Sequence, residues 1–326
     1  MNMKKWQDDI LAGKIKKPLP ILSYPGLTLI GRTVKEAVNN SDIQAETMKA
    51  VADRCDASAC VTLMDLSVEA ECFGADVTFF DHAVPAVNGS SIKDPEDIIK
   101  LAVPDVDSCR AGIFIETVKK AKTLINDRPC LCGAVGPFSL AGRLLGVTES
   151  MFMCFDEPDS MKLLLEKGTE FIINFIGKMK EAGADGVIIA EPVAGLLSPE
   201  LEEEFSAPYI KRIANVFASD DFITVYHNCG QGVTKMTDSI YANGCDAYHF
   251  GNVSDLSIML DKAPCNKLVM GNIDPVAYFK DGTPEDMEKA VASLKDSCSS
   301  YNNFVLSSGC DIPPAAKWEN IDAFFK

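Results

Sequence analysis

Positive charge is scarce in this sequence. Its 31 Lys and Arg residues face 47 Asp and Glu residues, so the net charge at pH 7 is −16 and the isoelectric point lies near 4.6. A surface this acidic is repelled at long range by phosphates and by anionic lipid headgroups. The composition therefore argues against nucleic acid or a membrane surface as the main partner, while leaving room for a local basic pocket.

Long apolar runs are also missing. The N-terminus, MNMKKWQDDILAGKIKK, is charged throughout and lacks the apolar stretch of about 7–15 residues that a signal peptide requires. No later segment reaches the roughly 18 consecutive apolar residues of a membrane-spanning helix. We therefore expect a cytoplasmic protein with no membrane partner.

The sequence contains no low-complexity tract, no linker rich in Pro, Gly or Ser, and no visible repeat. A chain of 326 residues can form a single domain, because α/β barrels routinely reach this length. We therefore expect one domain, residues 1–326.

Cysteine, in contrast, is abundant. The twelve cysteines are scattered along a long chain without a secretion signal, so we expect reduced thiols rather than disulfides. Most of them should pack as small apolar side chains. Those within or beside apolar runs are Cys60, Cys130, Cys132 and Cys245.

Short apolar runs alternate with longer stretches of helical periodicity, an order typical of βαβ units and a parallel sheet. Eight runs are predicted strands: 21–25, 59–65, 130–136, 186–192, 222–228, 247–252, 267–274 and 304–310. Eight strands with helical crossovers indicate an α/β fold of the (β/α)8 or TIM barrel type. An open doubly wound sheet is the alternative, but it usually has fewer strands at this length. We also expect an N-terminal helical extension, and an inserted hairpin or lid within 66–128.

Polar side chains stand at the predicted C-terminal ends of the strands, where the active sites of such barrels lie. They are Asp65, Glu191, His227, Cys229, Asn252, Asn272, Asp274 and Cys310.

Three of these residues predict a zinc site. His227 and Cys229 are two positions apart at the end of one strand, so both side chains lie on the same side. Cys310 follows the last strand and opens onto the same mouth. One imidazole and two thiolates suit zinc and leave its fourth position for water or substrate, as in catalytic sites. The alternative is two ordinary thiols beside a hydrogen-bonded histidine.

A zinc ion that carries two thiolates forms hydroxide poorly but holds a substrate thiol well as a nucleophilic thiolate. We therefore expect attack of sulfur on an electrophilic alkyl group. Hydrolysis is less favoured.

These residues resemble a known family, the uroporphyrinogen decarboxylase-like barrels, and within it the corrinoid-dependent methyltransferases typified by methylcobamide:coenzyme M methyltransferases. The resemblance rests on His227 and Cys229 in YHNCGQ, on Cys310 in SSGCDIPP, and on the stretches MDLSVEAECFGADVTF (64–79) and GPFSLAGRLLG (136–146). It implies the same barrel, with Zn²⁺ activating an acceptor thiol. It also implies methylcobalamin as methyl donor, carried by a separate corrinoid protein that docks over the barrel mouth.

Several functions remain open at this point. The acceptor is a thiol such as coenzyme M, or a folate, and the reverse direction would load cob(I)alamin from a methylated amine, ether or thioether. A decarboxylase would need an arginine-rich N-terminal segment for the carboxylates of a porphyrinogen, whereas this segment contains Arg32 alone. A non-catalytic barrel that binds a corrinoid protein or a tetrapyrrole is a further alternative. The chain lacks a D-x-H-x-x-G motif, so we do not expect it to hold the corrinoid itself.

The remaining polar residues receive provisional roles. Glu191 is a fourth zinc ligand, a base for the thiol proton, or only a cap of the following turn. Asp65 corresponds to the acidic residue that the decarboxylases use on their substrate, and its role here is open. Asn252 and Asn272 would orient the substrate or the corrinoid. Two more carboxylates, Glu69 and Glu71, are expected to be solvated or part of a lid, and His249 could face the barrel interior.

Overall fold

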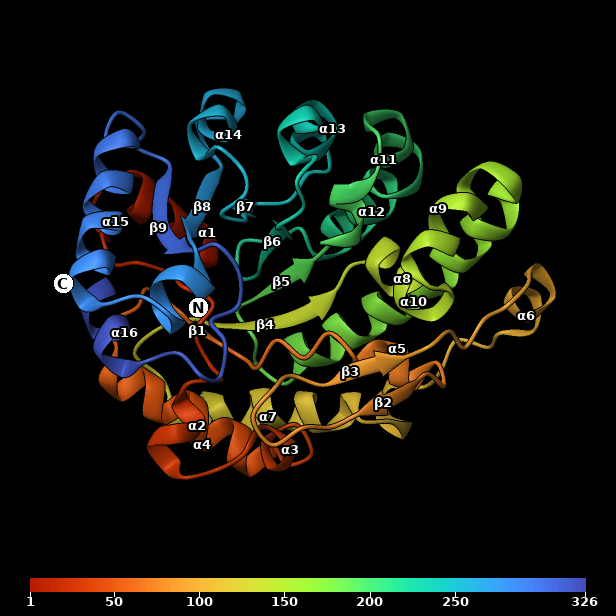
Figure 1. Ribbon diagram of the computed structural model, residues 1–326, viewed down its shortest axis with the longest axis horizontal. Coiled ribbons are helices and arrows are strands. Elements are labelled where there is room, and N and C mark those ends of the chain that lie inside the picture. The colour runs from red at the N-terminus through yellow and green to blue at the C-terminus, as the bar shows by residue number, and fades with distance from the viewer.

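A computed structural model describes residues 1–326 of the chain. Its centre is a curved sheet of seven parallel strands, in the order β1-β4-β5-β6-β7-β8-β9. The strands are β1 (Cys60–Val61), β4 (Cys130–Val135), β5 (Gly186–Ala190), β6 (Ile223–Asn228), β7 (Ala247–Phe250), β8 (Leu268–Ile273) and β9 (Phe304–Ser308). Figure 1 shows helices around the outside of this sheet, so the predicted barrel type of α/β fold is confirmed.

Most helices follow the strands as crossovers. In chain order the α-helices are α1 (Met3–Leu11), α2 (Gly26–Ile30), α3 (Val34–Ala37), α4 (Ser41–Arg54), α5 (Val68–Cys72), α6 (Pro95–Lys100), α7 (Ala111–Leu124), α8 (Pro137–Leu145), α9 (Val147–Asp156), α10 (Pro158–Glu181), α11 (Pro199–Phe205), α12 (Ala207–Phe217), α13 (Thr237–Ala242), α14 (Leu256–Lys262), α15 (Pro284–Ser297) and α16 (Trp318–Phe324). Short 3-10 turns are η1 (Val106–Ser108), η2 (Val193–Leu196) and η3 (Val233–Lys235), and η4 (Pro275–Lys280) is a π-helix. None of these helices combines the length and the apolarity needed to cross a bilayer.

The first predicted strand, 21–25, is wrong. The segment 18–22 lies between β9 and the start of β1 and forms only isolated bonds: the Leu19 N–H donates to the Leu306 carbonyl, and the Ser58 N–H donates to the Pro18 carbonyl. Pro18 and Pro20 have no N–H group, which prevents a regular ladder. The sheet therefore has seven strands, and an irregular segment joins its two edges.

Helix α1 closes the N-terminal end of the barrel. Asn2 caps the helix by accepting from the Lys5 N–H. Its apolar face, Met3, Trp6 and Ile10, belongs to the same buried cluster as the interior side chains of the strands. Burial of such large side chains contributes on the order of 1.5–3 kcal/mol each. The predicted N-terminal helical extension is confirmed, and it leaves the C-terminal end of the barrel as the open one.

Each strand sends alternate side chains to opposite sides. In β5, Ile188 and Ala190 belong to the cluster inside the barrel, whereas Val187 and Ile189 belong to the cluster beneath the helices. By the same alternation, Glu191 continues the side that faces the helices.

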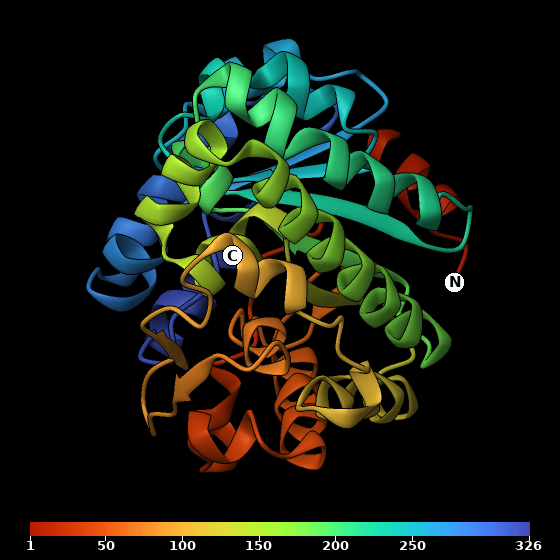
Figure 2. The same cartoon turned by 90° about the vertical axis from the view of Figure 1, so that its right-hand side faces the viewer.

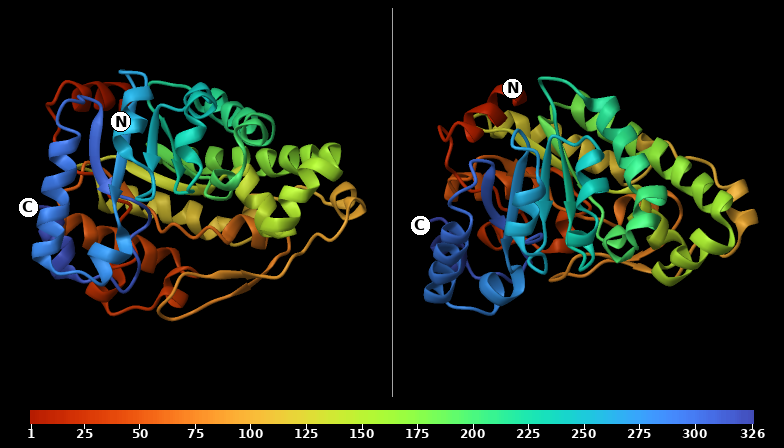
Figure 3. Two further views of the ribbon diagram at one scale, coloured as in Figure 1. Left: turned by 45° about the horizontal axis from the view of Figure 1, so that its top comes forward. Right: turned by 90° about the horizontal axis from the view of Figure 1, so that it is seen from above.

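The inserted stretch 66–128 forms an arm beside the barrel mouth. It contains α5, an antiparallel hairpin of β2 (Asp76–Thr78) and β3 (Ala86–Asn88), α6, η1 and α7. Figure 3 shows the hairpin, in orange, extending along one side of the molecule, and Figure 2 shows α6 in front of α10. The Lys167 ammonium group on α10 donates to the Ile98 and Leu101 carbonyls at the end of α6. The predicted hairpin is therefore confirmed.

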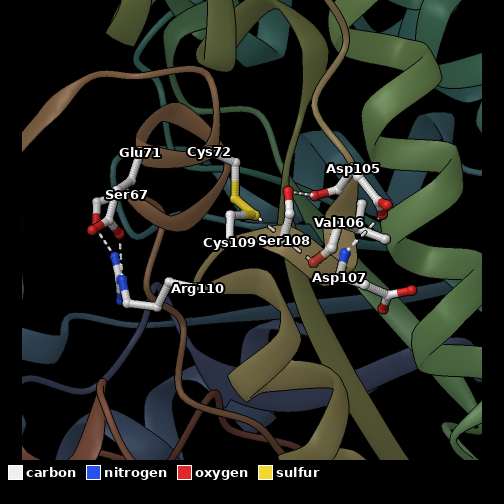
Figure 4. The surroundings of a disulfide bond; sticks show 9 residues. All are labelled: Ser67, Glu71, Cys72, Asp105, Val106, Asp107, Ser108, Cys109 and Arg110. Atoms are coloured by element: carbon white, nitrogen blue, oxygen red, sulfur yellow. Dashed lines mark hydrogen bonds and ion pairs between the residues drawn. A yellow bond between two sulfur atoms is a disulfide. The ribbon is translucent and has the colours of Figure 1, made fainter.

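A disulfide joins Cys72, at the end of α5, to Cys109, just before α7. This contradicts the expectation that all cysteines are reduced thiols. The two Cα atoms lie 5.5 Å apart, a separation at which a disulfide is commonly found, and only the folding of the insert brings them together. The other cysteines are free, and Cys60, Cys130, Cys132 and Cys245 are buried as expected. Figure 4 shows the bond beside Arg110.

The C-terminal helix α16 packs against α2 and α4 on the outside of the sheet. Arg54 on α4 forms two hydrogen bonds with Asp322 on α16, and its guanidinium lies over the Trp318 ring. The Trp318 indole N–H donates to the Thr28 hydroxyl on α2. These contacts hold the C-terminal helix against α2 and α4.

Candidate metal centre

The structure brings together the three residues of the predicted zinc site. His227 lies near the end of β6, Cys229 follows that strand directly, and Cys310 follows β9. Their ligand atoms all lie within 4.8 Å of one another. The His227 imidazole is buried and the two cysteines are partly buried. The three side chains therefore converge at the C-terminal end of the barrel, on its interior side.

The spacing of these atoms suits a tetrahedral ion. With a Zn–N bond of about 2.05 Å and Zn–S bonds of about 2.3 Å, the edges of a zinc tetrahedron measure about 3.5–3.8 Å. The His227 Nε2 atom lies 3.7 Å from the Cys310 sulfur, which matches such an edge. Three protein ligands leave a fourth position for a further group.

A chain of hydrogen bonds orients the His227 ring. The Ser307 hydroxyl donates to the Leu19 carbonyl at 2.6 Å and therefore accepts from the His249 Nε2 atom at 2.8 Å. The Nδ1 atom of His249 lies 2.8 Å from the Nδ1 atom of His227, and burial lowers the pKa of His249 well below its usual value. A neutral His249 protonated on Nε2 must accept a hydrogen bond at Nδ1 from the Nδ1–H group of His227. The Nε2 lone pair of His227 is thus left free to bind a metal.

The two thiols influence each other. The contact with Cys310 lowers the pKa of Cys229. The same contact, together with burial, raises the pKa of Cys310 to about 12. Cys229 is therefore the first of the pair to become a thiolate.

Two glycines allow the loops around the cluster to approach closely. A Cβ atom on Gly251, after β7, would lie 2.6 Å from the Cα atom of Cys229. A Cβ atom on Gly309, before Cys310, would lie 2.7 Å from the backbone nitrogen of Asn252. Only glycine permits such close approach, and it packs the loops of β6, β7 and β9 against one another.

Glu191 lies apart from the cluster of His227, Cys229 and Cys310. Its carboxylate accepts from the backbone N–H groups of Phe138 and Ser139, in the first turn of α8. The side chain is fully buried, and burial raises its pKa to about 8. Among the roles considered for this residue, the structure shows a cap, on the preceding helix α8 rather than on the turn that follows β5.

Asp65 is held by a buried ion pair. One carboxylate oxygen accepts from the Ser67 N–H and hydroxyl, and the other accepts from Arg110. The Arg110 guanidinium also bonds the Ser67 hydroxyl and Glu71, as Figure 4 shows. Both oxygens of Asp65 are therefore occupied by protein groups, and the carboxylate stands at the mouth as part of a rigid network.

Asn252 and Asn272 line a pocket of about 580 Å³ between the end of β8 and α15, together with Asp274. Asn252 donates to the Asp274 carboxylate, and Asn272 donates to the Gly251 and Ser254 carbonyls. None of the three residues of the His227, Cys229 and Cys310 cluster lines this pocket. The structure places the two asparagines beside the cluster rather than in it.

Glu69 is not solvated, which contradicts the expectation for this residue. It is fully buried, and one carboxylate oxygen accepts from the Val135 N–H at the end of β4. Strand β1 is only two residues long and ends before it could pair with the last residues of β4. The Glu69 carboxylate accepts from the Val135 N–H in its place. Burial raises its pKa to about 7. Glu71 is half-exposed and pairs with Arg110.

Sequence reasoning assigned no role to Ser307 or Arg110, and left His249 only as a residue of the barrel interior. The signal for His249 was its position on a strand next to that of His227, since the two residues are in register.

Known proteins match most of this chain. The profile of the uroporphyrinogen decarboxylase (URO-D) family matches residues 24–326. The chain belongs to the URO-D family. This confirms the resemblance that the motifs indicated.

Relatives within the URO-D family include two kinds of enzyme. The methylcobamide:CoM methyltransferase MtbA of Methanosarcina mazei is 31% identical over 253 residues, covering 76% of this chain and 72% of that protein. The uroporphyrinogen decarboxylase of Chlorobaculum tepidum is 29% identical over 272 residues, covering 79% and 76%. A solved methyltransferase structure from Methanosarcina mazei superimposes with a TM-score of 0.87 at 22% identity, covering 99% of this chain and 97% of that one. Family membership thus establishes the fold and an enzymatic ancestry, and the site must decide the reaction.

Proposed function

We propose that this URO-D family member is a zinc-dependent methyltransferase that moves a methyl group between a corrinoid protein and a thiol acceptor. The observation that carries the proposal is the convergence of His227, Cys229 and Cys310 on one point of the barrel mouth. The similarity to MtbA, whose name specifies methylcobamide and CoM, supports the same reaction class.

The donor set fits this chemistry. Zinc bound by one imidazole and two thiolates would hold an acceptor thiol as its thiolate, the nucleophile for a methyl group on a corrinoid cobalt. The protein's own residues supply the supporting tasks. His249 and Ser307 keep the Nε2 atom of His227 unprotonated, and Glu191 fixes the start of α8 beside the mouth. We assign Glu191 this positioning role, and Asp65 with Arg110 a similar one beyond the end of β1.

The decarboxylase alternative lacks its binding groups. Arg32, the single arginine of the N-terminal segment before α3, lies on the surface and pairs with Glu36. A substrate with many carboxylates would find no cluster of cations there. A folate acceptor is disfavoured for another reason, since its nitrogen is a poor match for a thiolate-rich zinc site.

A corrinoid protein would dock over the open end of the barrel. Exposed apolar side chains occur in the segments that follow four different strands: Val147, Leu196, Val253 and Val276. Apolar surface around a site that must exclude water is typical of a contact region. We assign Asn252 and Asn272, on the same rim, to contacts with the corrinoid or the substrate.

Anaerobic absorbance spectroscopy tests the proposal. Zinc-loaded protein is mixed with methylcobalamin and, in turn, with coenzyme M, homocysteine, simple thiols and tetrahydrofolate. We expect cob(I)alamin to appear with a thiol acceptor. His227→Ala and Cys310→Ala should lose zinc and reaction while the fold persists by circular dichroism, whereas Cys265→Ala, at an exposed free thiol, should keep both.

The outcomes separate the alternatives. Zinc and turnover retained in both ligand variants would remove this site from the mechanism. Zinc present but no reaction with any acceptor would favour the opposite direction, in which a methylated amine, ether or thioether loads cob(I)alamin. Absence of zinc from carefully reduced protein would favour a non-catalytic barrel.

A further inference from the structure

A cationic segment follows α1 in this acidic protein. Residues 10–35 contain five Lys and Arg residues and no Asp or Glu. Lys16 and Lys17 are exposed near the start of this segment, and Lys17 pairs with Asp56, whereas Lys16 pairs with no carboxylate. Charges farther away than about 8 Å are largely screened at physiological ionic strength. An anion at this place therefore meets local positive charge rather than the net charge of the molecule.

A cavity of about 470 Å³ lies between this segment, the start of β9 and α15. Figure 3 shows α1, in red, at the same end of the molecule as the start of β9. Phe304 stands six residues before Cys310, which is about 20 Å of extended strand, so the cavity lies at the opposite end of the sheet from the metal centre. Its lining combines apolar side chains with three lysines: Ile15, Phe304, Leu306, Lys16, Lys17 and Lys295.

The first half of β9 presents a free edge to this cavity. The Val269 N–H on β8 donates to the Asn303 carbonyl, and in a parallel ladder every second residue bonds the same neighbour. Phe304 and Leu306 therefore direct their backbone groups away from β8. The Leu306 carbonyl accepts from the Leu19 N–H, but the Phe304 carbonyl and the Leu306 N–H have no backbone partner in the chain before Leu19.

These two free groups match the bonding pattern of one added residue. In a parallel pair, a residue of the added strand donates to the carbonyl of one residue and accepts from the N–H group two positions further on. A single extended residue would thus bond both the Phe304 carbonyl and the Leu306 N–H. Free strand edges of this kind are where extended peptides add to a sheet.

The direction of the neighbouring chain limits the length of an added strand. The segment 18–22 runs parallel to β9, because the Leu19 N–H donates to the Leu306 carbonyl. Two residues further on, the Ile21 N–H donates to the Ser308 hydroxyl. A strand added in the same direction meets Leu19 at its C-terminal end and cannot continue past it. The added chain must therefore end inside the cavity.

We propose that this cavity binds the extended C-terminal end of a partner protein. The last residue of the partner donates its N–H to the Phe304 carbonyl, and its carboxylate accepts from the Leu306 N–H. Lys16 and Lys295, neither of which pairs with a carboxylate of this chain, neutralise the terminal charge. The site is independent of the metal centre, so it stands or falls separately from the methyl transfer.

Two peptide libraries test the site. Randomised N-acetylated hexapeptides, one set with a free C-terminal carboxylate and one with a C-terminal amide, are mixed with the native protein. The retained peptides are counted by mass spectrometry after gel filtration. We expect retention of free acids, with amidation of the best peptide weakening its binding by on the order of ten- to a hundredfold. No retained peptide, or equal retention of acids and amides, would overturn the proposal.

Substitution of the two free lysines places the peptide in this cavity. The double variant Lys16→Gln and Lys295→Gln should weaken binding of the best peptide, labelled with fluorescein and followed by anisotropy, by on the order of tenfold. The matched control is the double variant Lys35→Gln and Lys211→Gln, at two exposed lysines elsewhere, which should bind as the native protein does. Equal binding by both double variants would show that the peptide sits elsewhere.

Amide exchange tests the strand pairing itself. The bound peptide should slow exchange of the Leu306 amide hydrogen, whereas the Val225 amide in the fully paired strand β6 should be unaffected. A peptide that binds without slowing the Leu306 amide would be held by charge alone, and strand addition would be wrong.

Discussion

At the scale of single residues, the contact between His227 and His249 fixes which nitrogen is free for a metal. Ser307→Ala would remove the acceptor for the His249 Nε2 proton, so the tautomers of both rings would no longer be set. Groups that orient a metal-binding histidine typically contribute about ten- to a hundredfold in affinity. We expect a zinc affinity lower by this factor, measured by competition with a chelator.

The matched control for this variant is Ser299→Ala, an exposed serine whose hydroxyl donates only to the Asp296 carbonyl. Its zinc affinity should equal that of the native protein. Native affinity in Ser307→Ala as well would show that the hydrogen-bond chain does not orient the ligand.

Another buried carboxylate makes stability depend on pH. Burial raises the pKa of Glu202 from its ordinary value of 4.5 to about 7, and one of its oxygens has no partner. As the pH rises from 4.5 to 7, the unfolded chain loses this proton while the folded protein keeps it, so stability falls. Above pH 7 the free energy of unfolding stays lower than at pH 4.5 by on the order of 3 kcal/mol.

Glu202→Gln removes this titration. We expect the free energy of unfolding of the variant, relative to the native protein, to be higher at pH 8 than at pH 4.5 by about that amount in urea titrations. Glu203→Gln, at an exposed position on the same helix, should shift stability equally at both pH values. An equal shift for Glu202→Gln would contradict a buried neutral carboxyl group.

The residue scale also shows where sequence reasoning stops. The H-x-C pair and the distant cysteine could be predicted, because strand ends in a barrel converge. The burial of Glu69 could not, because it depends on β1 ending after two residues. The side chain of Glu191 follows the alternation of Ile188, Ile189 and Ala190 along β5. Which of these residues face the barrel interior is known only from the folded sheet.

At the scale of elements, the Cys72–Cys109 disulfide ties α5 to the start of α7. It closes a loop with a sequence separation of 37 residues, and a cross-link of this span stabilises a protein by about 3–4 kcal/mol in the chain-entropy account. Cys72→Ser should lower the free energy of unfolding by this order in urea titrations, and a reductant should have the same effect on the native protein.

The exposed thiol of Cys265 supplies the control, because Cys265→Ser should leave the urea midpoint unchanged with and without reductant. If the midpoint of Cys72→Ser equals that of the native protein, the bond contributes nothing to stability. Neither its pairing nor its presence could be predicted, because the two cysteines approach only after the hairpin arm has folded.

Element prediction was right wherever apolar runs coincide with free backbone N–H groups. Every sheet strand after the first predicted one was found, but the run 21–25 failed because Pro18 and Pro20 interrupt the ladder just before it. The apolar side chains Leu19 and Ile21 still enter the barrel interior, which explains why the run resembles a strand in sequence.

At the scale of the whole molecule, we expect residues 1–326 to unfold as one domain. Arg54, Trp318 and Asp322 fasten the C-terminal helix to α2 and α4, and α1 packs into the barrel interior. Neither α1 nor the C-terminal helix can therefore unfold without exposing buried side chains of the rest of the molecule. Calorimetry should show a single transition that coincides with the loss of near- and far-ultraviolet circular dichroism; two separated transitions would indicate independent domains.

The irregular segment 18–22 also has a consequence for fluctuations. Between β9 and β1, the 18–22 segment forms only isolated backbone hydrogen bonds instead of a regular ladder. Strand pairing is therefore weakest at this point of the barrel. Amide hydrogens along it should exchange with solvent sooner than those of β5 and β6. Cys310 follows β9, which borders this irregular segment. His227 and Cys229 lie at the end of β6, which is fully paired on both sides. An ion bound by all three side chains would link β9 to β6 across the opening of the sheet. Hydrogen exchange along the 18–22 segment should therefore slow when the ion is bound.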